Sequence, residues 1–235
     1  MSTRSRHLAN ITQLRQVAER LGSMNDTVVY IGGSVVGLLI SDKGAPDARP
    51  TDDVDLIVET TGIDYGQAEA TLAKLGFEHD LSEDAHMHRY LLDGLKVDIL
   101  PVDGKAFGMN TEWHPAVLRT AQIYKFEDDL SIRIISPPLL ICTKLAAHAD
   151  RGNNELKMSK DFGDILALTD GREELYEEIS NSEIFIKAFI AGHFKTFLND
   201  HIALTEVFSW QLDRDQLARE DLILNRMKKI AKCHN

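Results

Sequence analysis

The chain has 235 residues, of which 43% are apolar, so at about 150 residues per domain we expect one or two globular domains. This composition excludes a mainly disordered chain, a small disulfide-stabilised protein and a fibrous repeat. The formal net charge of −11 argues against a surface coated in basic residues for indiscriminate nucleic-acid binding. A local basic patch remains compatible with it.

The small number of cysteines and the short apolar runs indicate the cellular compartment. Cys142 and Cys233 are too few for a disulfide framework and match no metal-ligand spacing. The polar start of the chain is followed by no apolar run of the kind that a secretory signal requires. The apolar stretch Val28–Ile40 is shorter than the ~20 residues that cross a bilayer. We therefore expect a cytoplasmic protein with no membrane partner.

The first part of the chain is predicted to mix helices and strands. In chain order, hydrophobic spacing and turn residues predict a helix over 8–21, strands at 27–31 and 53–58 with a helix over 34–40 between them, and a helix near 65–75. Two further strands, 89–92 and 95–100, flank Asp93-Gly94, which is a strong type I′ hairpin signal. A last strand is expected at 131–135.

The second part is predicted to be helical. Pro137-Pro138 can begin a helix, and no proline follows them. The expected helices lie at about 138–150, 159–169, 172–180, 183–199, 201–211 and 213–232. The prediction is therefore an α+β fold, with an α/β domain over 1–136 whose small mixed sheet is flanked by helices, and a helical domain over 137–235.

Gly32-Gly33-Ser34 stands where the first predicted strand turns into a helix. Glycines let a backbone approach a ligand closely, and free N–H groups at the start of a helix attract phosphate. A merely tight connection between the two elements explains the same residues equally well.

Asp53 and Asp55 occupy alternate positions of a strand, so both side chains project from one face. Two such carboxylates repel each other unless a cation lies between them, and Mg²⁺ prefers oxygen ligands of this kind. A solvated polar strand face is the alternative. The strand continues with the apolar residues Leu56-Ile57-Val58, which indicate a buried strand and so argue against that alternative.

Asp98 lies on the second strand of the hairpin. Pairing across Asp93-Gly94 places Arg89 opposite Asp98, so an exposed ion pair is one interpretation. The other makes Asp98 a third carboxylate on the face of Asp53 and Asp55. Three such groups can hold two cations about 3.5–4 Å apart, an arrangement that serves phosphoryl transfer.

These motifs together resemble the polymerase-β-type nucleotidyltransferase superfamily, and within it the AbiEii/MenT nucleotidyltransferase toxins of bacterial toxin–antitoxin and phage-defence systems. Thr51-Asp-Asp-Val-Asp55 matches the family's Thr/Ser-x-Asp-Ile/Val-Asp pattern. The family's helical motif is matched by Lys144-Leu145, Arg151 and Lys160-Asp161-Phe-Gly-Asp164. The resemblance covers about residues 28–168.

The residues of that helical motif can also be interpreted directly. Lys144, His148 and Arg151 recur at i, i+4 and i+7, so one helix face presents cations that suit a triphosphate. A solvent-facing polar stripe opposite Leu145 and Ala149 is the alternative. Asp161 could orient Lys144 through an ion pair or contact the nucleotide, and Asp164 is expected to cap or pair locally.

The resemblance implies a metal-dependent enzyme that transfers NMP from an NTP to an acceptor hydroxyl. Asp53, Asp55 and Asp98 would be the metal ligands, with two Mg²⁺ ions in the active complex, and Asp98 would help to deprotonate the acceptor. Gly33 and Ser34 would bind the β- and γ-phosphates, and Asp161 would belong to the same nucleotide site. Lys144 would be a fourth catalytic residue, which neutralises charge on the leaving pyrophosphate together with Arg151. The resemblance implies a tRNA 3′ end as one acceptor, with a protein hydroxyl and a small metabolite as the open alternatives, and a cognate antitoxin protein as a partner.

Two alternative functions are compatible with parts of the same sequence. The first is a nucleotidyltransferase fold that has lost turnover and serves as a binding or regulatory module, although all three carboxylates are present. The second is a dinucleotide-binding enzyme, whose G-x-G-x-x-G fingerprint fails because Ser34 stands in place of the second glycine. His86 and His88, which share a strand face, are expected to be surface histidines rather than a zinc site.

Overall fold

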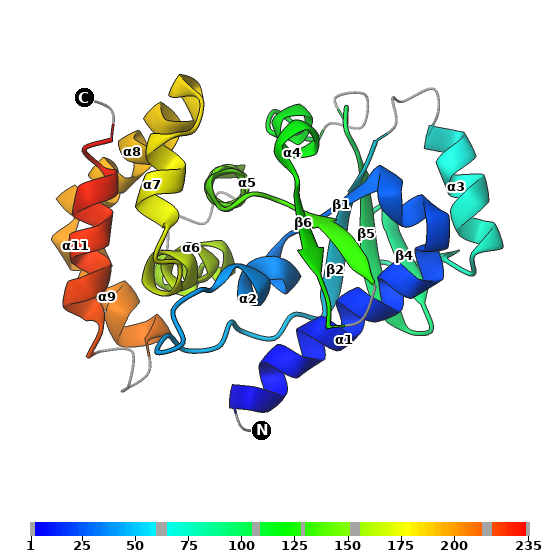
Figure 1. Cartoon of the computed structure of the whole chain (residues 1–235), viewed down its shortest axis with the longest axis horizontal. Coiled ribbons are helices and arrows are strands. Elements are labelled where there is room, and N and C mark those ends of the chain that lie inside the picture. Colours follow the sequence, from blue (N-terminus) through cyan, green and yellow to red (C-terminus); the bar gives the residue numbers. More distant parts are fainter. Residues whose placement is uncertain are drawn as a thin grey trace. The chain divides into compact units, whose positions relative to one another are not determined.

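The computed structural model describes residues 3–59, 65–104, 109–127, 130–150, 156–212 and 218–233. The chain divides into two compact units (Figure 1). The first consists of Met1–Gly37 and Arg49–Ser136, and the second of Leu38–Ala48 and Pro137–Asn235. The second unit therefore includes a short segment, Leu38–Ala48, that lies in the first quarter of the sequence, before the strand that carries Asp53 and Asp55.

The first unit is built on a mixed sheet, which in the described residues has seven strands in the order β3-β4-β5-β2-β1-β7-β6. Strand β2 pairs antiparallel with β1 on one side and parallel with β5 on the other. The strands are β1 (Val28–Ile31), β2 (Asp53–Val58), β3 (Glu78–His79), β4 (Arg89–Leu92), β5 (Leu95–Pro101), β6 (Gln122–Lys125) and β7 (Ser131–Ile134). This architecture, followed by a helical second part, confirms the predicted α+β class.

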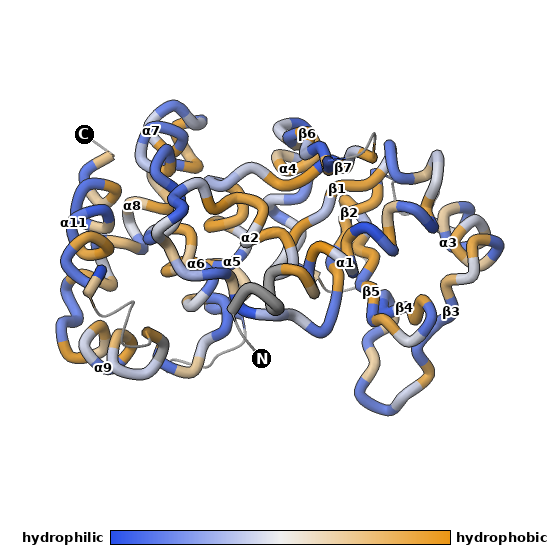
Figure 2. Tube along the Cα trace, turned by 60° about the horizontal axis from the view of Figure 1, so that its bottom comes forward, coloured by the Kyte–Doolittle hydropathy of each residue, from blue (hydrophilic) through white to orange (hydrophobic). Residues whose placement is uncertain are grey.

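The central strands form the core because their sequences are apolar on both faces. All four residues of β1 are buried, and so are the last three residues of β2. Figure 2 shows both strands as hydrophobic segments. Since each strand is also hydrogen-bonded on both edges, the polar residues at the start of β2 are held on a rigid support.

The hairpin between β4 and β5 forms as predicted. Asp93 and Gly94 both have positive φ, at 50° and 84°, as a type I′ turn requires. This two-residue turn sets the register in which Leu92 faces Leu95 and Arg89 faces Asp98. The turn sequence alone therefore fixed which side chain lies opposite Asp98.

Helices flank this sheet. Helix α1 (Thr3–Leu21) runs across the sheet and contacts β2, and α3 (Tyr65–Lys74) precedes the β3 edge (Figure 1). The helix expected over 34–40 is shorter than predicted. A 3-10 turn, η2 (Gly33–Val35), leads into α2 (Val36–Leu39). The sequence did not predict three further elements, because they are short or polar and show no clear hydrophobic period. They are β3, α4 (His114–Thr120) and β6.

The second unit is helical in the residues that the structure describes. In chain order it contains α5 (Pro137–Asp150), the short turn η4 (Leu156–Met158), α6 (Lys160–Gly171), α7 (Leu175–Ser180), α8 (Ile184–Asn199), α9 (His201–Gln211) and α11 (Glu220–Ile230). Ser159 caps α6 by accepting a hydrogen bond from the Phe162 N–H at 3.2 Å. None of the described helices combines the length and apolar character that crossing a membrane demands.

The segment Leu38–Ala48 joins the second unit through the end of α6. The backbone N–H groups of Ser41 and Asp42 both donate to the carbonyl oxygen of Gly171, each at 2.9 Å. Arg219 pairs with Asp170 and with Asp42, which ties the same segment to the helix. These contacts explain why residues so distant in sequence share one compact unit.

Candidate functional site

Three carboxylates meet at the start of β2 and the middle of β5. The parallel pairing of these strands places Asp55 directly opposite Asp98, and Asp53 lies two residues before Asp55 on the same face. Each of the three offers an oxygen, and these oxygens all lie within 4.8 Å of one another. Asp98 is buried, at 5% exposure, whereas Asp53 and Asp55 are half-buried. We call Asp53, Asp55 and Asp98 the acidic cluster.

The strand that carries Asp53 and Asp55 is anchored from α1. The buried Asn10 donates from Nδ2 to the carbonyl oxygen of Arg49 at 3.0 Å and accepts from the Thr51 N–H at 3.1 Å. The Thr51 hydroxyl donates in turn to the carbonyl oxygen of Asp53 at 3.1 Å. The chain therefore enters β2 in a fixed orientation. Asn10 lies about forty positions from its partners, so no local pattern could have indicated this role.

Gly32 is required by one member of the acidic cluster. Ile31 pairs with Asp55 across the sheet, and the following Gly32 has φ of 76°. A Cβ atom at position 32 would lie 1.9 Å from Oδ2 of Asp55. Glycine was expected here because it permits close approach of a ligand. In the structure it permits the close approach of Asp55, a carboxylate of the acidic cluster.

Gly33 and Ser34 form the turn beside this site. Ser34 is 1% exposed, with its Oγ 3.5 Å from the carbonyl oxygen of Ile31. Its side chain is therefore directed into the unit. A Cβ atom at Gly33 would lie 2.8 Å from Nη2 of Arg49, so this guanidinium rests against the turn. Arg49 was not predicted to lie beside this turn, and its position shortly before β2 was the only signal in the sequence.

Asp98 is both a member of the acidic cluster and an ion-pair partner of Arg89. Arg89 donates from Nε to Oδ1 at 2.8 Å and from Nη2 to Oδ2 at 2.7 Å. His86 adds a third contact, with its Nε2 3.0 Å from Oδ2. These hydrogen bonds with Asp98 raise the pKa of Arg89. Asp98 is therefore the ion-pair partner of Arg89 and also a third carboxylate beside Asp53 and Asp55, but its pair with Arg89 is not exposed, as the first interpretation expected, because Asp98 is buried.

The acidic cluster has the donor chemistry that Mg²⁺ binds. Its ligand atoms are carboxylate oxygens on two adjacent strands, held in place by the sheet and by the glycine at position 32. The Nη2 atom of Arg89 lies 3.8 Å from Oδ2 of Asp53, so one guanidinium offsets part of the cluster's charge. Three carboxylates and one guanidinium leave a net charge of about −2, which one divalent cation would neutralise.

The histidines near Asp98 differ from each other. His86 is exposed, as expected, but His88 is buried, at 3% exposure, which corrects the expectation that both lie on the surface. The ring of His88 packs in a T-shaped contact against Tyr65, whose hydroxyl lies 3.1 Å from Nδ1. Burial lowers the pKa of His88, so its ring is neutral near pH 7.

The predicted nucleotide-binding residues of the helical part lie in the second unit. Lys144 of α5 is buried, at 8% exposure, and its Nζ is 3.2 Å from Oδ1 of Asp161 and 2.7 Å from Oδ2 of Asp164. Both aspartates belong to α6 and are themselves buried. The expected ion pair between Asp161 and Lys144 is present, and Asp164 pairs locally as predicted.

The other two members of the predicted cationic face are His148 and Arg151, of which the structure describes only His148. His148 contacts Oγ of Ser159 through Nδ1 at 2.9 Å, so it braces the start of α6. Arg151 lies outside the described residues. Since Lys144 faces the buried aspartates of α6, the alternative of a solvent-facing polar stripe does not describe this side chain.

Comparison with known proteins gives a fold and no family. No family model matches the chain, and no curated protein matches its sequence. The crystal structure of JHP933 from Helicobacter pylori is similar with a TM-score of 0.49 at 15% identity, over 97% of this chain and 93% of that one.

A second solved structure, described as a candidate nucleotidyltransferase from H. pylori, is similar with a TM-score of 0.52. The two chains are 15% identical, and the likeness covers 100% of this chain and 97% of the other. This likeness is one of fold, and it does not show which subfamily the chain belongs to. The chain has a nucleotidyltransferase-type fold.

Proposed function

We propose that the protein is a metal-dependent nucleotidyltransferase that transfers NMP from an NTP to an acceptor hydroxyl. The observation that carries this proposal is the acidic cluster, in which Asp53, Asp55 and Asp98 bring carboxylate oxygens within 4.8 Å of one another. The cluster stands on the central strands of a nucleotidyltransferase-type fold, next to a glycine turn. A solvated polar strand face would not need a buried third carboxylate.

Asp53, Asp55 and Asp98 would hold the Mg²⁺ ions, two in the active complex. When bound, Mg²⁺ supplies charge neutralisation for the phosphates and polarises the groups that react at the α-phosphorus. The half-buried Asp53 and Asp55 remain accessible to a cation that enters together with the nucleotide. Asp98 is the less accessible ligand, because Arg89 and His86 contact both of its oxygens.

In the proposed reaction the acceptor oxygen attacks the α-phosphorus of the NTP, and the bond from that phosphorus to the bridging oxygen of the β-phosphate breaks. Pyrophosphate leaves, and NMP remains on the acceptor. Asp98 would take the proton from the acceptor hydroxyl as general base. Arg89 and His86 fix the orientation of that carboxylate, so its oxygens are positioned before the acceptor binds.

The triphosphate would be bound by the glycine turn and by cations. The backbone of Gly33 and Ser34 and the guanidinium of Arg49 would contact it in the first unit. Lys144, oriented by Asp161, and Arg151 would neutralise charge on the leaving pyrophosphate, as the family resemblance implies. The resemblance also implies a tRNA 3′ end as acceptor, a toxin role and a cognate antitoxin.

The test is a transfer assay with a matched control. The full chain is incubated with each α-³²P-labelled NTP, Mg²⁺ and cellular RNA, protein or small-molecule fractions. We expect labelled product from the wild type and from Asp52→Ala, an exposed neighbour outside the acidic cluster. We expect none from Asp53→Asn/Asp55→Asn. Transfer that survives in this double variant would contradict the proposal.

One observation favours a second function, a binding module without turnover. Both oxygens of Asp98 are engaged by Arg89, as in a purely structural ion pair. This alternative predicts Mg²⁺-dependent NTP binding by equilibrium dialysis with no transfer to any fraction and no release of pyrophosphate. The nucleotidyltransferase proposal predicts both binding and release.

A further inference from the structure

The glycine turn lies between two side chains of opposite charge. A Cβ atom at Gly32 would lie 1.9 Å from Oδ2 of Asp55, and a Cβ atom at Gly33 would lie 2.8 Å from Nη2 of Arg49. Because consecutive Cα atoms are only about 3.8 Å apart, the carboxylate and the guanidinium lie against one short stretch of backbone. A triphosphate bound at this turn, beside the acidic cluster, would therefore lie near Arg49 as well.

A guanidinium at this turn suits a triphosphate. One divalent cation would offset the net charge of the acidic cluster and Arg89, so the phosphates require further positive charge. Arginine binds phosphate through two parallel hydrogen bonds, which fix the direction of the group as well as its charge. Arg49 is half-buried, so it remains partly accessible to a ligand. Binding of this kind requires the backbone that carries the guanidinium to keep its position.

Asn10 of α1 fixes that backbone. This residue is 2% exposed, and its Nδ2 donates to the carbonyl oxygen of Arg49 at 3.0 Å, while its Oδ1 accepts from the N–H of Thr51 at 3.1 Å. One side-chain amide therefore holds both residues that flank Pro50. Since the residue before a proline is restricted to extended conformations, the backbone of Arg49 has little freedom left.

The same hydrogen bonds continue from Asn10 to the acidic cluster. Thr51 is buried and donates from its hydroxyl to the carbonyl oxygen of Asp53 at 3.1 Å. Asn10 is thus linked in one direction to the residue whose guanidinium lies at the turn, and in the other to the backbone of a proposed metal ligand. Phosphoryl transfer depends mainly on how such groups are placed relative to one another.

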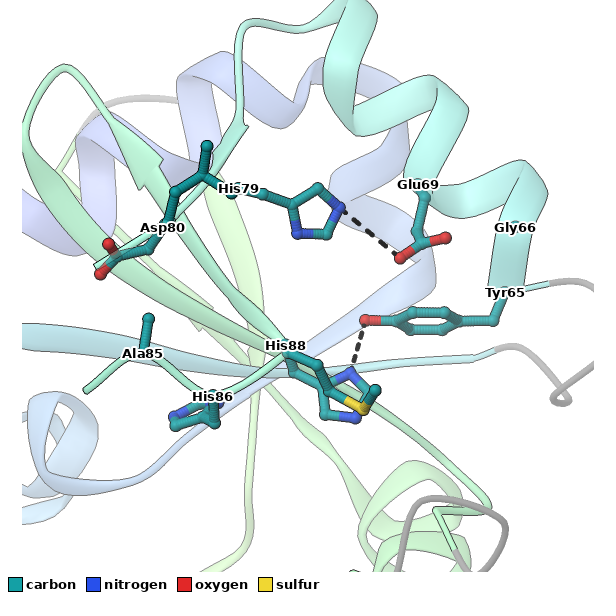
Figure 3. Close-up of a pocket in the computed structure, with 10 residues that line it drawn as sticks. Tyr65, Gly66, Glu69, His79, Asp80, Ala85, His86 and His88 are labelled. Carbon is teal, nitrogen blue, oxygen red and sulfur yellow. Dashed lines mark hydrogen bonds and ion pairs between the residues drawn. The ribbon is translucent and has the colours of Figure 1, made fainter. Parts of the chain in front are cut away.

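The pocket between α3 and the loop from β3 to β4 contains none of these residues (Figure 3). It measures about 460 Å³, and its ten lining residues, all of them described, include no member of the acidic cluster and no residue of the glycine turn. Figure 3 shows Tyr65 and His88 joined there by a hydrogen bond of their own. This pocket is therefore not where a triphosphate would meet the acidic cluster.

We propose that Asn10 is a positioning residue of the nucleotide site, which holds Arg49 in place to bind the β- and γ-phosphates. The inference rests on the proposed nucleotidyltransferase function and adds a residue to its triphosphate site. Asn10 is buried and acts through Arg49 without touching the nucleotide. Its loss should weaken binding of a triphosphate and leave binding of a monophosphate nearly unchanged.

The test compares the binding of triphosphates and monophosphates. The probes are the α,β-methylene analogues of ATP, GTP, CTP and UTP, which cannot release pyrophosphate, and the matching NMPs, all with Mg²⁺. Equilibrium dialysis with the full chain gives the ratio of the two affinities for the nucleotide that the wild type binds most tightly. Arg49→Gln should lower this ratio about ten- to thirtyfold, because hydrogen bonds to a charged group are lost. Asn10→Ser should lower it about three- to tenfold, because the guanidinium remains but is held less firmly.

The matched control is Asn25→Ser. Asn25 is also buried in the first unit, at 7% exposure, where its Nδ2 donates to the carbonyl oxygen of Ser131 at 2.8 Å and its Oδ1 accepts from the hydroxyl of Tyr30 at 2.9 Å. Both asparagine variants should lose stability in urea, yet Asn25→Ser should keep the wild-type affinity ratio. An equal fall of the ratio in both variants would overturn the inference, since any buried asparagine would then have the same effect.

A double-mutant cycle shows whether Asn10 acts through Arg49. If it does, adding Asn10→Ser to Arg49→Gln should lower the affinity ratio no further, whereas additive losses would contradict the inference. Asn10→Asp is the second variant should Asn10→Ser not fold, because it keeps the acceptor for the N–H of Thr51 and loses the donor to Arg49. An unchanged ratio in the folded variant, an equal loss of NMP affinity, or no binding of any analogue by the wild type would also overturn the inference.

A transfer assay separates this inference from the proposed function. Binding that follows the predicted order, without transfer of NMP to any fraction, would contradict the proposed function alone. Transfer by the wild type, together with an unchanged KM for NTP in Asn10→Ser, would contradict the inference alone. If both are right, Asn10→Ser should raise KM for NTP by a larger factor than it lowers kcat.

Discussion

Arg89 holds Asp98 through two parallel hydrogen bonds, from Nε to Oδ1 at 2.8 Å and from Nη2 to Oδ2 at 2.7 Å. Such bidentate pairs are among the strongest that proteins make, and they fix the plane of the carboxylate. Nη2 also lies 3.8 Å from Oδ2 of Asp53, so the guanidinium is shared between two members of the acidic cluster. The protein therefore carries a permanent counter-charge where a metal would also bind.

Removing that counter-charge should destabilise the protein and increase its dependence on Mg²⁺. Arg89→Gln leaves the buried Asp98 without its main partner, and we expect a loss of about 3 kcal/mol in the free energy of unfolding. Mg²⁺ should recover more of this loss than it adds to the wild type, because it replaces the missing charge. Thermal unfolding with and without Mg²⁺ measures both quantities.

The control for this experiment is Arg20→Gln, which breaks the exposed pair between Arg20 and Asp93. Exposed pairs contribute up to about 1 kcal/mol, so this variant should lose little stability and gain nothing extra from Mg²⁺. An equal Mg²⁺ effect in both variants would show that Arg89 does not compete for the metal-binding carboxylates.

Gly32 should tolerate no side chain. In Gly32→Ala the new Cβ would lie 1.9 Å from Oδ2 of Asp55, so either the turn or the carboxylate must move. Gly94→Ala is the matched control, since Gly94 also has positive φ, at 84°, but has nothing within 4 Å of an added Cβ. The control should lose about 1–2 kcal/mol from backbone strain alone.

The two glycine variants should therefore differ in function more than in fold. Gly32→Ala is expected to lose more stability than Gly94→Ala, as measured by urea unfolding, and to lose Mg²⁺-dependent transfer. If Gly32→Ala retains transfer at the level of Gly94→Ala, the position of Asp55 is not essential to the site.

Much of the acidic cluster could be predicted because short-range rules determine it. Alternation along a strand places Asp53 and Asp55 on one face, and the Asp93-Gly94 turn fixes Arg89 opposite Asp98. What no rule of this kind supplies is the parallel pairing of β2 with β5, which brings Asp98 beside Asp55. A third carboxylate on a neighbouring strand was accordingly one of two interpretations of Asp98, and the pairing itself was not predicted.

The residues that sequence reasoning missed all act over long separations. Asn10 reaches Arg49 and Thr51 from a helix about forty positions away, and Tyr65 reaches Ile99 across the sheet. Nothing in their local spacing distinguishes them from other polar residues. Short elements such as β3 were missed for a related reason, because two residues cannot show a period.

Lys144 provides a test of a buried charge network. It lies between Asp161 and Asp164, at 3.2 and 2.7 Å, and all three are buried. Lys144→Met would leave two carboxylates buried together, and we expect a loss of about 3–5 kcal/mol in the free energy of unfolding. The triple variant Lys144→Met/Asp161→Asn/Asp164→Asn should recover most of it, because no uncompensated charge remains.

The same variants separate a structural role from nucleotide binding. If Lys144 serves the triphosphate, the triple variant should fold stably and yet bind Mg²⁺-NTP more weakly than the wild type by equilibrium dialysis. Unchanged NTP binding in that variant would confine Lys144 to a structural role in the second unit.

His114 should make the stability of the protein depend on pH. It is 6% exposed, its Nδ1 lies 2.9 Å from the carbonyl oxygen of Pro101, and burial lowers its pKa from the ordinary value of 6.5. The unfolded chain therefore binds a proton more readily than the folded one as the pH falls through about 6.5. The stabilisation from the neutral folded ring is complete above that pH and is lost progressively below it.

The free energy of unfolding, measured in urea from pH 7.5 to 5.5, should accordingly fall with pH in the wild type. His114→Gln removes one of the titrating groups and should flatten this dependence, even if it lowers stability at every pH. His88, whose pKa burial also lowers, accounts for part of the remainder, so His88→Gln/His114→Gln should be flatter still. The carboxylates with lowered pKa values, such as Asp42 and Glu174, affect stability only at lower pH and leave this window unaffected. A slope in His114→Gln equal to that of the wild type would show that folding does not change the pKa of His114.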